Sequence, residues 1–427
     1  MKNSYGLESS CTDRKRLASG RIFSLLAVLV SFAGASPNTA PDGSQIIAGA
    51  MRAEGLRFTC TPAQLIKLES GMAAYLSELD IVPAYVAVQV DRTHGTATYT
   101  LTTPIDDVNT LDFFDRAEFR LRDAVIELPL KNGKKRKVDT VSRKEIVLAL
   151  LQHGRLTEFK GAACDVDALK DHVGIRQNIV AWAEVLEFGW PDGGPAKWNE
   201  KYWKHGTPQP GLPLHFAMSD MFLNQKKYKI GCYTVTKMVV IQGVLDYYRR
   251  VRKDPAILKL VEHQLSADSE PLVDIEPGRV WDFEAEFDEK EFDRPGKLLS
   301  VQYGIAPKNF VPGDWSYLLN TDPQTYQKTG YEGSNAIYLG RGKLNDYYND
   351  HDHSYSYRQK LHEVYQWRNH VFSRRRDADK VKPLTAQDLE RLGRTPAEGG
   401  IVLSLRISPY LFGYQKLPVI LKSYQLR

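Results

Sequence analysis

The sequence contains one cysteine whose position predicts nucleophilic chemistry. Cys232 follows Gly231 and opens a stretch with helical apolar spacing that runs to about Arg252. Gly231 lets the chain turn into that helix without a side-chain clash. Unpaired backbone N–H groups and the helix dipole at such an N-terminus favour the thiolate, which is the reactive form of cysteine. The same N–H groups help to stabilise the oxyanion that forms when a thiolate attacks a carbonyl carbon. A buried structural cysteine is the alternative.

A thiol of this kind needs a proton acceptor, and one candidate is a carboxylate. The segment 331–340 predicts a strand in which Glu332 and Ser334 lie on one face, because side chains alternate along a strand. Glu332 works as a base near neutral pH only if burial raises its pKa. Asp314, in the turn that precedes the strand predicted up to Asn320, is expected to be a structural turn residue.

Histidines supply the other candidate base. His351 and His353 follow the predicted strand, and histidine changes its charge near neutral pH without special burial. The sequence leaves open whether Glu332 or one of these histidines accepts the proton. The His-Asp-His cluster lacks a second set of ligands with the spacing of a structural zinc site, so we predict neither a metal nor an organic cofactor.

Three segments resemble a known family. They are GCYTVTKMVVIQGVLDYY, VPGDWSYLLNTDP and GYEGSNAIYLG, and in this order they resemble the bacterial spore-coat protein-glutamine gamma-glutamyltransferases, or transglutaminases. The upstream segment WNEKYW is also similar, so that the resemblance covers about residues 198–410. It implies an α+β fold with a papain-like or NlpC-like cysteine domain, in which a helix bearing Cys232 packs on an antiparallel sheet. NlpC-type cell-wall cysteine peptidases are similar more distantly.

The chain departs from the family pattern at two positions. The family's strand glutamate falls on Ser334, and the glutamate that precedes the family's cysteine falls on Gly231, whereas Asn335 is kept. The resemblance implies substrate contacts at Ser334 and Asn335. The aromatic group that includes Trp190 and Trp203 is the other candidate for lining a substrate groove, with core packing as its alternative.

The activity implied by the resemblance is transfer of an acyl group from glutamine. Cys232 would attack the γ-carboxamide of a protein glutamine, and a lysine amine would resolve the thioester to give an isopeptide crosslink. The partners are then proteins or peptides with Gln and Lys side chains. Two alternatives remain: an exported NlpC-like peptidase or amidase that acts on cell-wall peptides, and a catalytically inactive binding or structural protein on the same fold.

The chain divides into four predicted parts. Residues 1–35 read as a signal peptide or anchor, and residues 36–56 as a flexible linker. Residues 57–160 predict a small α+β domain with a helix after Thr61, hairpins at His94-Gly95 and Asn132-Gly133, and a helix from Ser142 to Gln152. Residues 161–427 form the transglutaminase-like cysteine domain, beginning with a helical pattern over 165–188.

The first part predicts export. Arg14-Lys15-Arg16 precede an apolar run over 22–30 that is shorter than the roughly 20 residues of a membrane span, and Ala33-Gly34-Ala35 suits cleavage. We therefore expect a secreted protein or one of the periplasm or cell envelope, with membrane contact only if the segment stays uncleaved. Export favours one disulfide, for which Cys60 and Cys164 are the obvious pair, and leaves Cys232 free. Two buried thiols are the alternative for Cys60 and Cys164.

The charge balance does not indicate a nucleic-acid-binding protein. The 57 Lys and Arg residues against 52 Asp and Glu residues give a net charge of +5 over 427 residues. The basic runs at 134–137 and 374–376 are expected in solvated turns.

Overall fold

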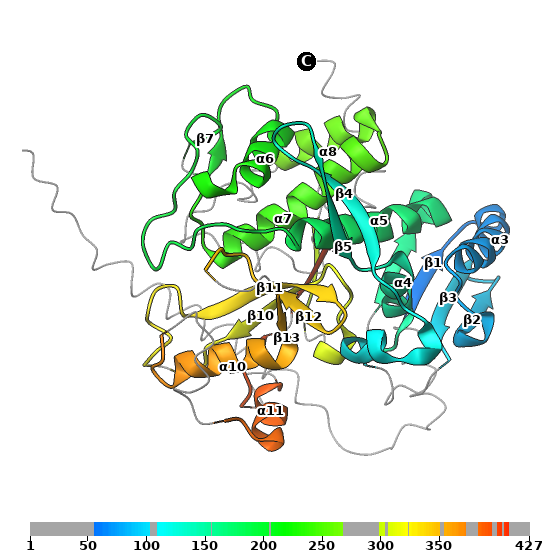
Figure 1. Cartoon of the computed structure of the whole chain (residues 1–427). Helices are drawn as coiled ribbons and strands as arrows, with labels where there is room; N and C mark the ends of the chain where they lie inside the picture. Colours follow the sequence, from blue (N-terminus) through cyan, green and yellow to red (C-terminus); the bar gives the residue numbers. More distant parts are fainter. Residues whose placement is uncertain are drawn as a thin grey trace, which may run out of the picture. The chain divides into compact units, whose positions relative to one another are not determined.

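The computed structural model describes residues 55–102, 109–154, 156–204, 206–267, 299–303, 306–322, 324–350, 354–372, 383–394, 399–403 and 405–409. All of them belong to one compact unit that spans residues 52–427. It mixes helices and strands, as predicted (Figure 1). The helices of seven or more residues in this part of the chain are α3 (Pro62–Glu78), α4 (Arg143–Leu151), α5 (Val166–Ala183), α6 (Leu214–Leu223), α7 (Cys232–Asp246), α8 (Pro255–Ala267), α10 (Tyr357–Arg368) and α11 (Ala386–Leu392).

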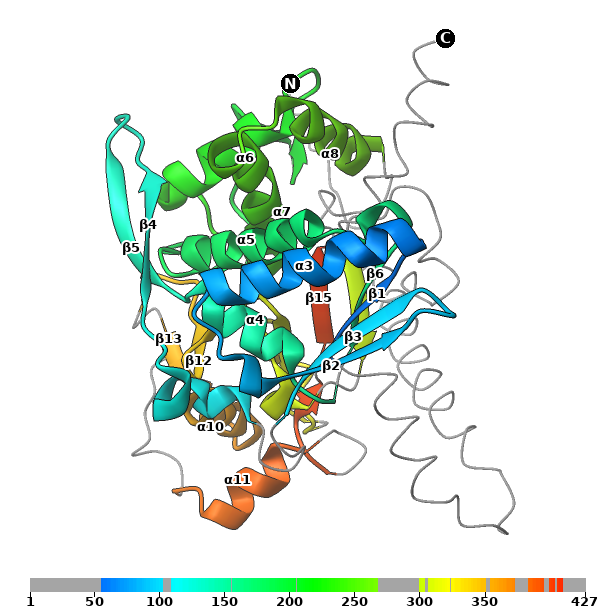
Figure 2. The same cartoon turned by 90° about the vertical axis from the view of Figure 1, so that its right-hand side faces the viewer.

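The N-terminal part of the described chain is built on a four-stranded sheet with the order β2-β3-β1-β6. Strand β1 pairs antiparallel with β3 and parallel with β6, and α4 packs on β1 and β3. A separate hairpin, β4 with β5, projects from the body of the molecule (Figure 2). The bounds of these strands are β1 (Gly55–Thr59), β2 (Val86–Asp91), β3 (Thr96–Leu101), β4 (Ala124–Pro129), β5 (Lys135–Thr140) and β6 (Leu156–Lys160).

Local sequence signals account for these elements. Helix α3 starts where Thr61 and Gln64 form a capping box, with Pro62 at the first helical position. Gly95 and Gly133 adopt positive φ in the two predicted hairpins, a conformation that favours glycine. The predicted disulfide between Cys60 and Cys164 is confirmed, with the two Cα atoms 5.4 Å apart. It ties the end of β1 to the chain just before α5.

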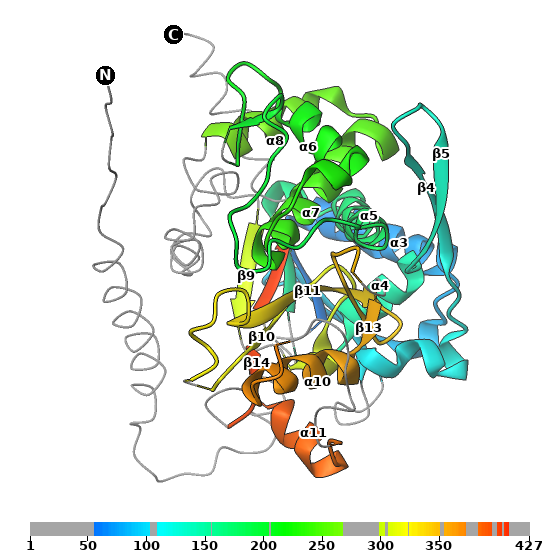
Figure 3. The same cartoon turned by 60° about the vertical axis from the view of Figure 1, so that its left-hand side comes forward.

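The cysteine domain is built on a five-stranded antiparallel sheet with the order β13-β12-β11-β10-β14. Helices α5 and α7 contact one face of β11, and α10 packs beneath the sheet against β10, β12 and β13 (Figures 1 and 3). The strands are β10 (Trp315–Leu319), β11 (Gly333–Gly340), β12 (Lys343–Asn345), β13 (Ser354–Ser356) and β14 (Val402–Leu403); two-stranded pairings join β7 (Trp203–Lys204) to β8 (Thr207–Pro208) and β9 (Leu299–Tyr303) to β15 (Leu405–Pro409).

Each face of this sheet has its own hydrophobic cluster. Trp315, Tyr317 and Ile337 belong to the large cluster that also contains the apolar side chains of α5 and α7. Leu318 and Ala336 belong to a second cluster that is shared with α10. Neighbouring residues of β10 and β11 thus enter different cores, as strand alternation requires. The sheet is the middle layer of three.

The predicted domain boundary at residue 160 does not coincide with a gap in the core. Phe58, Leu148 and Val239 are fully buried in one cluster, although they come from both sides of that boundary. The division into domains over 57–160 and 161–427 therefore stays a prediction about the sequence, and the two parts share a hydrophobic interior.

Two helices do not end where their patterns of apolar residues predict. Helix α5 stops at Ala183, five residues before the predicted end, and the chain turns toward the glycine-rich segment after Phe188. The helix after Cys232 is α-helical only to Asp246 and continues as a π-helical turn, Tyr247–Val251, to the predicted end near Arg252.

Several predictions fall outside the described residues. They are the signal or anchor over 1–35, nearly all of the linker over 36–56, the basic run at 374–376, and both candidate histidines, His351 and His353. None of the helices in the described part of the chain has the length and apolar character that crossing a bilayer requires.

Candidate active site

Cys232 is the first residue of α7, as the sequence predicts. Gly231 is the N-cap and offers no side chain to the open N–H groups of the first turn. Every residue of α7 from Thr234 to Asp246 is buried, whereas Cys232 and Tyr233 are only partly buried. Among the described residues Cys232 is the one free cysteine. The helix therefore lies inside the domain and presents its thiol at its one accessible end.

The sulfur of Cys232 receives a hydrogen bond from a side chain of the central sheet. The Nδ2 atom of Asn335, on β11, donates to the sulfur at 3.3 Å. Trp315, on the neighbouring strand β10, donates its indole N–H to the Oδ1 atom of Asn335 at 2.8 Å. Because an indole nitrogen only donates, this second bond orients the amide with its NH2 group toward the sulfur. A donor held in this way stabilises a negative charge on the sulfur.

The carbonyl group of Cys232 is held from inside the domain. Thr236, one helical turn later, donates its hydroxyl to the Cys232 carbonyl oxygen at 2.7 Å. Its oxygen lies 2.6 Å from the hydroxyl oxygen of Tyr347. Since Thr236 has already used its one proton, Tyr347 is the donor of this bond. Burial raises the pKa of Tyr347 well above the usual tyrosine value and keeps it neutral, although its hydrogen bond with Thr236 acts in the opposite direction.

Ser334 lies on the opposite face of β11 from the thiol. Across the β10–β11 ladder Tyr317 pairs with Asn335, and Leu318 pairs with Ser334. Cross-strand partners share a face, and Leu318 belongs to the cluster beneath the sheet. Ser334 is buried there, with 3% of its surface exposed. The structure therefore brings Asn335 to Cys232 and turns Ser334 away.

Glu332 lies just before β11, because the strand begins at Gly333. Ser334 faces away from the thiol, and because Glu332 precedes the strand, the expectation that the two side chains share a face stays a prediction. The carbonyl of Glu332 still accepts a hydrogen bond from the backbone N–H of Asn320 at 2.9 Å. The carboxylate of Glu332 accepts a hydrogen bond from the backbone N–H of Gly330 at 2.8 Å. Burial raises the pKa of Glu332, while the backbone hydrogen bonds act in the opposite direction.

The two candidate groove tryptophans have different surroundings. Trp203 is completely buried, and its ring lies 5.3 Å from the ring of Trp198. Trp203 therefore follows the core-packing alternative. Trp190 is only partly buried and packs edge-on against Tyr331, 5.4 Å away. The residue before it, Gly189, bonds through its N–H to the carbonyl of Tyr228, close to the start of α7. Of the two, only Trp190 thus keeps an accessible surface.

Asp314 is a structural residue, as predicted. Its Oδ2 atom accepts from the backbone N–H of Val311, which closes the Pro-Gly-Asp turn, and its Oδ1 atom accepts from Arg176 of α5 at 2.8 Å. Both side chains of this ion pair are completely buried. The pair holds α5 to the turn that starts β10, and so fixes the strand that carries Trp315.

His351 and His353 lie outside the described residues, so their roles stay predictions. Within the described ranges, no group of three or more His, Cys, Asp or Glu side chains is arranged to hold a metal ion.

Comparison with known proteins places the sequence in a family. The sequence model of the protein-glutamine gamma-glutamyltransferases matches residues 128–368, which is more than half of the chain. The chain belongs to this family. The match includes Cys232 and the strands β10 and β11, which carry Trp315 and Asn335, and it begins inside the β4–β5 hairpin.

Relatives of the transglutaminase family share a limited part of their length with the chain. Proteins named protein-glutamine gamma-glutamyltransferase from Bacillus cereus (strain AH820) and Bacillus anthracis (strain A0248) are 24% identical over 184 residues, which are 41% of this chain and 55% of theirs. The chain thus spans about half the length of these curated relatives. A solved transglutaminase from Geobacillus stearothermophilus, without its C-terminal extension, is 16% identical and covers 58% of this chain and 95% of its own, with a TM-score of 0.33.

Sequence reasoning missed three members of this transglutaminase-family site. They are Trp315, Thr236 and Tyr347, which orient the amide beside the sulfur and hold the cysteine carbonyl. Thr236 had a local signal, since it lies four residues after Cys232 and therefore on the same helix face. Trp315 and Tyr347 had none, because their contacts depend on strand pairing and on a segment more than 100 residues away.

Proposed function

We propose that the chain catalyses acyl transfer from protein glutamine to lysine through a thioester on Cys232. The observation that carries this proposal is the hydrogen bond from Asn335 to an accessible sulfur at the start of α7. Membership of the transglutaminase family supports the reaction class. A helix bearing the cysteine and packed on an antiparallel sheet supports a papain-like domain, which we propose as the finer fold assignment.

The reaction has two steps with balanced atoms. In the first, the sulfur gives its proton to a base and attacks the glutamine carbonyl carbon, and the tetrahedral intermediate collapses as the C–N bond breaks. The leaving nitrogen takes up the proton and departs as ammonia. In the second, a lysine amine attacks the thioester, loses a proton, and the C–S bond breaks to regenerate the thiol. The product is an isopeptide crosslink.

The accepting base in this proposal is Glu332, with His351 and His353 as the alternatives. The raised pKa of Glu332 suits a carboxylate that takes a proton from a thiol and returns it to an amine. The backbone N–H groups of the first turn of α7 are placed to bind the oxyanion, because the N-cap Gly231 leaves them without a side-chain acceptor. Asn335 has the second role of keeping the sulfur in place.

The substrates in this proposal are proteins or peptides with Gln and Lys side chains, and the location is outside the cytoplasm. The disulfide between Cys60 and Cys164 supports export, because disulfides persist in oxidising compartments. Trp190 is the proposed contact for the substrate backbone near the thiol.

Incorporation of a fluorescent primary amine into a glutamine-containing protein tests the proposal. The wild-type chain is expected to incorporate the amine and release ammonia, and Cys232→Ala is expected to lose at least 10³-fold of this activity, since removing a catalytic nucleophile leaves only binding. Ser334→Ala, on the other face of β11, is the matched control and should keep its activity. Equal incorporation by Cys232→Ala would contradict the thioester.

The same protein preparation distinguishes the proposed acyl transfer from the rival peptidase or amidase activity. The wild-type chain is incubated with purified peptidoglycan and without any amine. Release of peptides by the wild-type chain but not by Cys232→Ala would support the cell-wall peptidase or amidase instead.

A further inference from the structure

One segment concentrates the positive charge of the molecule. Residues 116–144 contain ten Lys and Arg residues against four Asp and Glu residues, a net charge of +6, whereas the whole chain carries +5. The segment comprises the η4 turn (Ala117–Phe119), the β4–β5 hairpin and the start of α4. Outside it, the remainder of the chain is close to neutral. The net positive charge of the chain therefore comes from this one segment.

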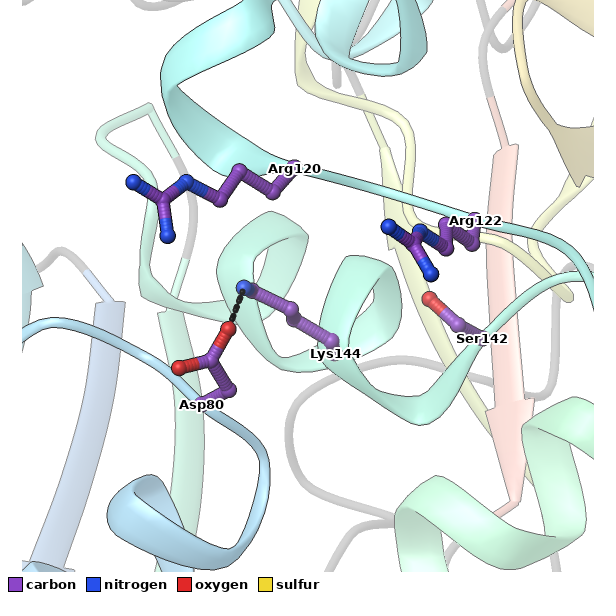
Figure 4. Close-up of a pocket in the computed structure, with 5 residues that line it drawn as sticks. All are labelled: Asp80, Arg120, Arg122, Ser142 and Lys144. Atoms are coloured by element: carbon purple, nitrogen blue, oxygen red, sulfur yellow. Dashed lines mark hydrogen bonds and ion pairs between the residues drawn. The ribbon is translucent and has the colours of Figure 1, made fainter.

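The two ends of this segment meet at a pocket of about 410 Å³, which is lined by Asp80, Arg120, Arg122, Ser142 and Lys144. Figure 4 shows Lys144 reaching Asp80 while the side chains of both arginines extend over the same opening. Lys144 and Asp80 form an ion pair at 3.2 Å. Neither arginine forms a side-chain ion pair with another described residue. Two guanidinium groups at this pocket are thus available to an added anion.

The β4–β5 hairpin starts and ends at the pocket, because β4 begins two residues after Arg122 and β5 ends two residues before Ser142. Every residue from Lys131 to Lys137 is exposed, and this run contains five cations. Within the described chain, only Lys135 among them has an ion-pair partner, Glu127 at 2.7 Å. A strand advances about 3.3 Å per residue, so the cations from Lys134 to Lys137 extend along about 10 Å at the tip of the hairpin. A chain with several negative charges fits this surface better than a single small anion.

The basic surface lies away from the thiol but on the same framework. Arg341, which follows β11, pairs with Asp123 at 3.1 Å, next to Arg122, and six strand residues, about 20 Å, separate it from Asn335. Arg250 donates to the carbonyl of Glu127 in the hairpin and lies 18 helical residues, about 27 Å, from Cys232. The surface is therefore too distant to take part in the chemistry.

We propose that the pocket and the β4–β5 hairpin together bind an acidic segment of the protein substrate and so raise the local concentration of its glutamine at Cys232. The proposal rests on the proposed function, which requires a polypeptide substrate. Arginine forks bind carboxylates in a bidentate manner, and the extended hairpin matches an extended peptide. Such docking acts through KM and weakens with salt, because the charges are exposed.

Two variants with the same change in net charge test the site. Arg120→Glu with Arg122→Glu alters the pocket, and Lys253→Glu with Lys259→Glu alters an exposed surface elsewhere. Neither pair belongs to the proposed catalytic residues. The substrates are a glutamine donor peptide and the same peptide followed by 20 Gly and Ser residues and six glutamates. A linker of this length spans about 25 Å, which matches the distances above.

For the wild-type chain, the acidic tail should lower KM about tenfold at low salt and leave kcat unchanged. The pocket variant should lose this gain and keep its rate on the tail-less peptide, and the control should retain the gain. An equal gain in the pocket variant, or an equal loss in the control, would overturn the proposal.

Binding to the Cys232→Ala protein separates this proposal from the proposed function. The anisotropy of a labelled hexaglutamate peptide is measured against that protein, with and without the two arginine substitutions, and so needs no activity. About tenfold weaker binding by the pocket variant supports the site even if no amine is incorporated. Tighter binding of a DNA duplex, or of vesicles with phosphatidylserine, than of the peptide at 150 mM salt would assign the surface to that polyanion and overturn the peptide site.

Discussion

The two faces of β11 differ in what their polar side chains do. On the face toward α7, Asn335 is bonded to both the sulfur of Cys232 and the indole of Trp315. On the face toward α10, Ser334 is buried opposite Leu318 in an apolar cluster. One step along a strand therefore changes a residue from a member of the site to a member of the second core. The comparison shows that the alternation of side chains along the strand, more than nearness in sequence, decides which residue meets the thiol.

The largest expected effect comes from Glu332, which lies just before the strand. If Glu332 is the base, Glu332→Gln should lower kcat/KM by about 10²–10⁴-fold. Glu332 must be ionised to accept a proton, and burial raises its pKa, so the wild-type rate should rise with pH through a midpoint above the ordinary glutamate value. The pH profile of kcat/KM for amine incorporation measures this.

The pH profile of Glu332→Gln should lack this rise at acidic pH, which is called the acidic limb below. A limb that persists in Glu332→Gln with its midpoint near the usual histidine value of about 6.5 would transfer the role to His351 or His353. His351→Gln and His353→Gln are the matched variants, and each should keep the limb if Glu332 acts.

The next effect concerns the stability that the buried ion pair between Arg176 and Asp314 gives to the domain. Asp314→Asn removes one partner of a completely buried ion pair and leaves Arg176 without its countercharge. The free energy of unfolding should fall by about 3–5 kcal/mol. Urea unfolding followed by tryptophan fluorescence measures it. Glu127→Gln, which breaks the exposed pair with Lys135, is the control and should change stability by less than about 1 kcal/mol. Equal losses would show that the buried pair has no special role.

The smallest effect tests the two faces directly. Asn335→Ala removes the donor to the sulfur and should lower kcat/KM about thirtyfold, which corresponds to about 2 kcal/mol for a hydrogen bond to a charged group. Ser334→Ala should change kcat/KM less than twofold. The rate at which iodoacetamide alkylates Cys232 provides a second measure, and it should fall only in Asn335→Ala. A larger loss in Ser334→Ala would reverse the assignment of the faces.

Local signals predicted much of the fold. The helices predicted after Thr61 and from Ser142 correspond to α3 and α4, each of which is capped by that residue, and Asn132-Gly133 gave the hairpin of β4 and β5. Each depends on a few adjacent residues whose backbone geometry is set by their own side chains. The end of α5 was misplaced by five residues, because apolar spacing continues past Ala183, whereas the backbone of Val185 and Glu187 is bonded to the side chain of Gln225.

The sequence by itself determined that Cys232 opens a helix behind a glycine and that Asp314 closes a turn, because each follows from residue type and spacing. It named Cys60 and Cys164 as a candidate pair, and the structure decided that they are bonded. Only the tertiary structure decided that Asn335, and not Ser334, meets the thiol, and that Tyr347 lies behind it. The start and pairing of β11 fix that choice, and a shift of one residue would exchange its two faces.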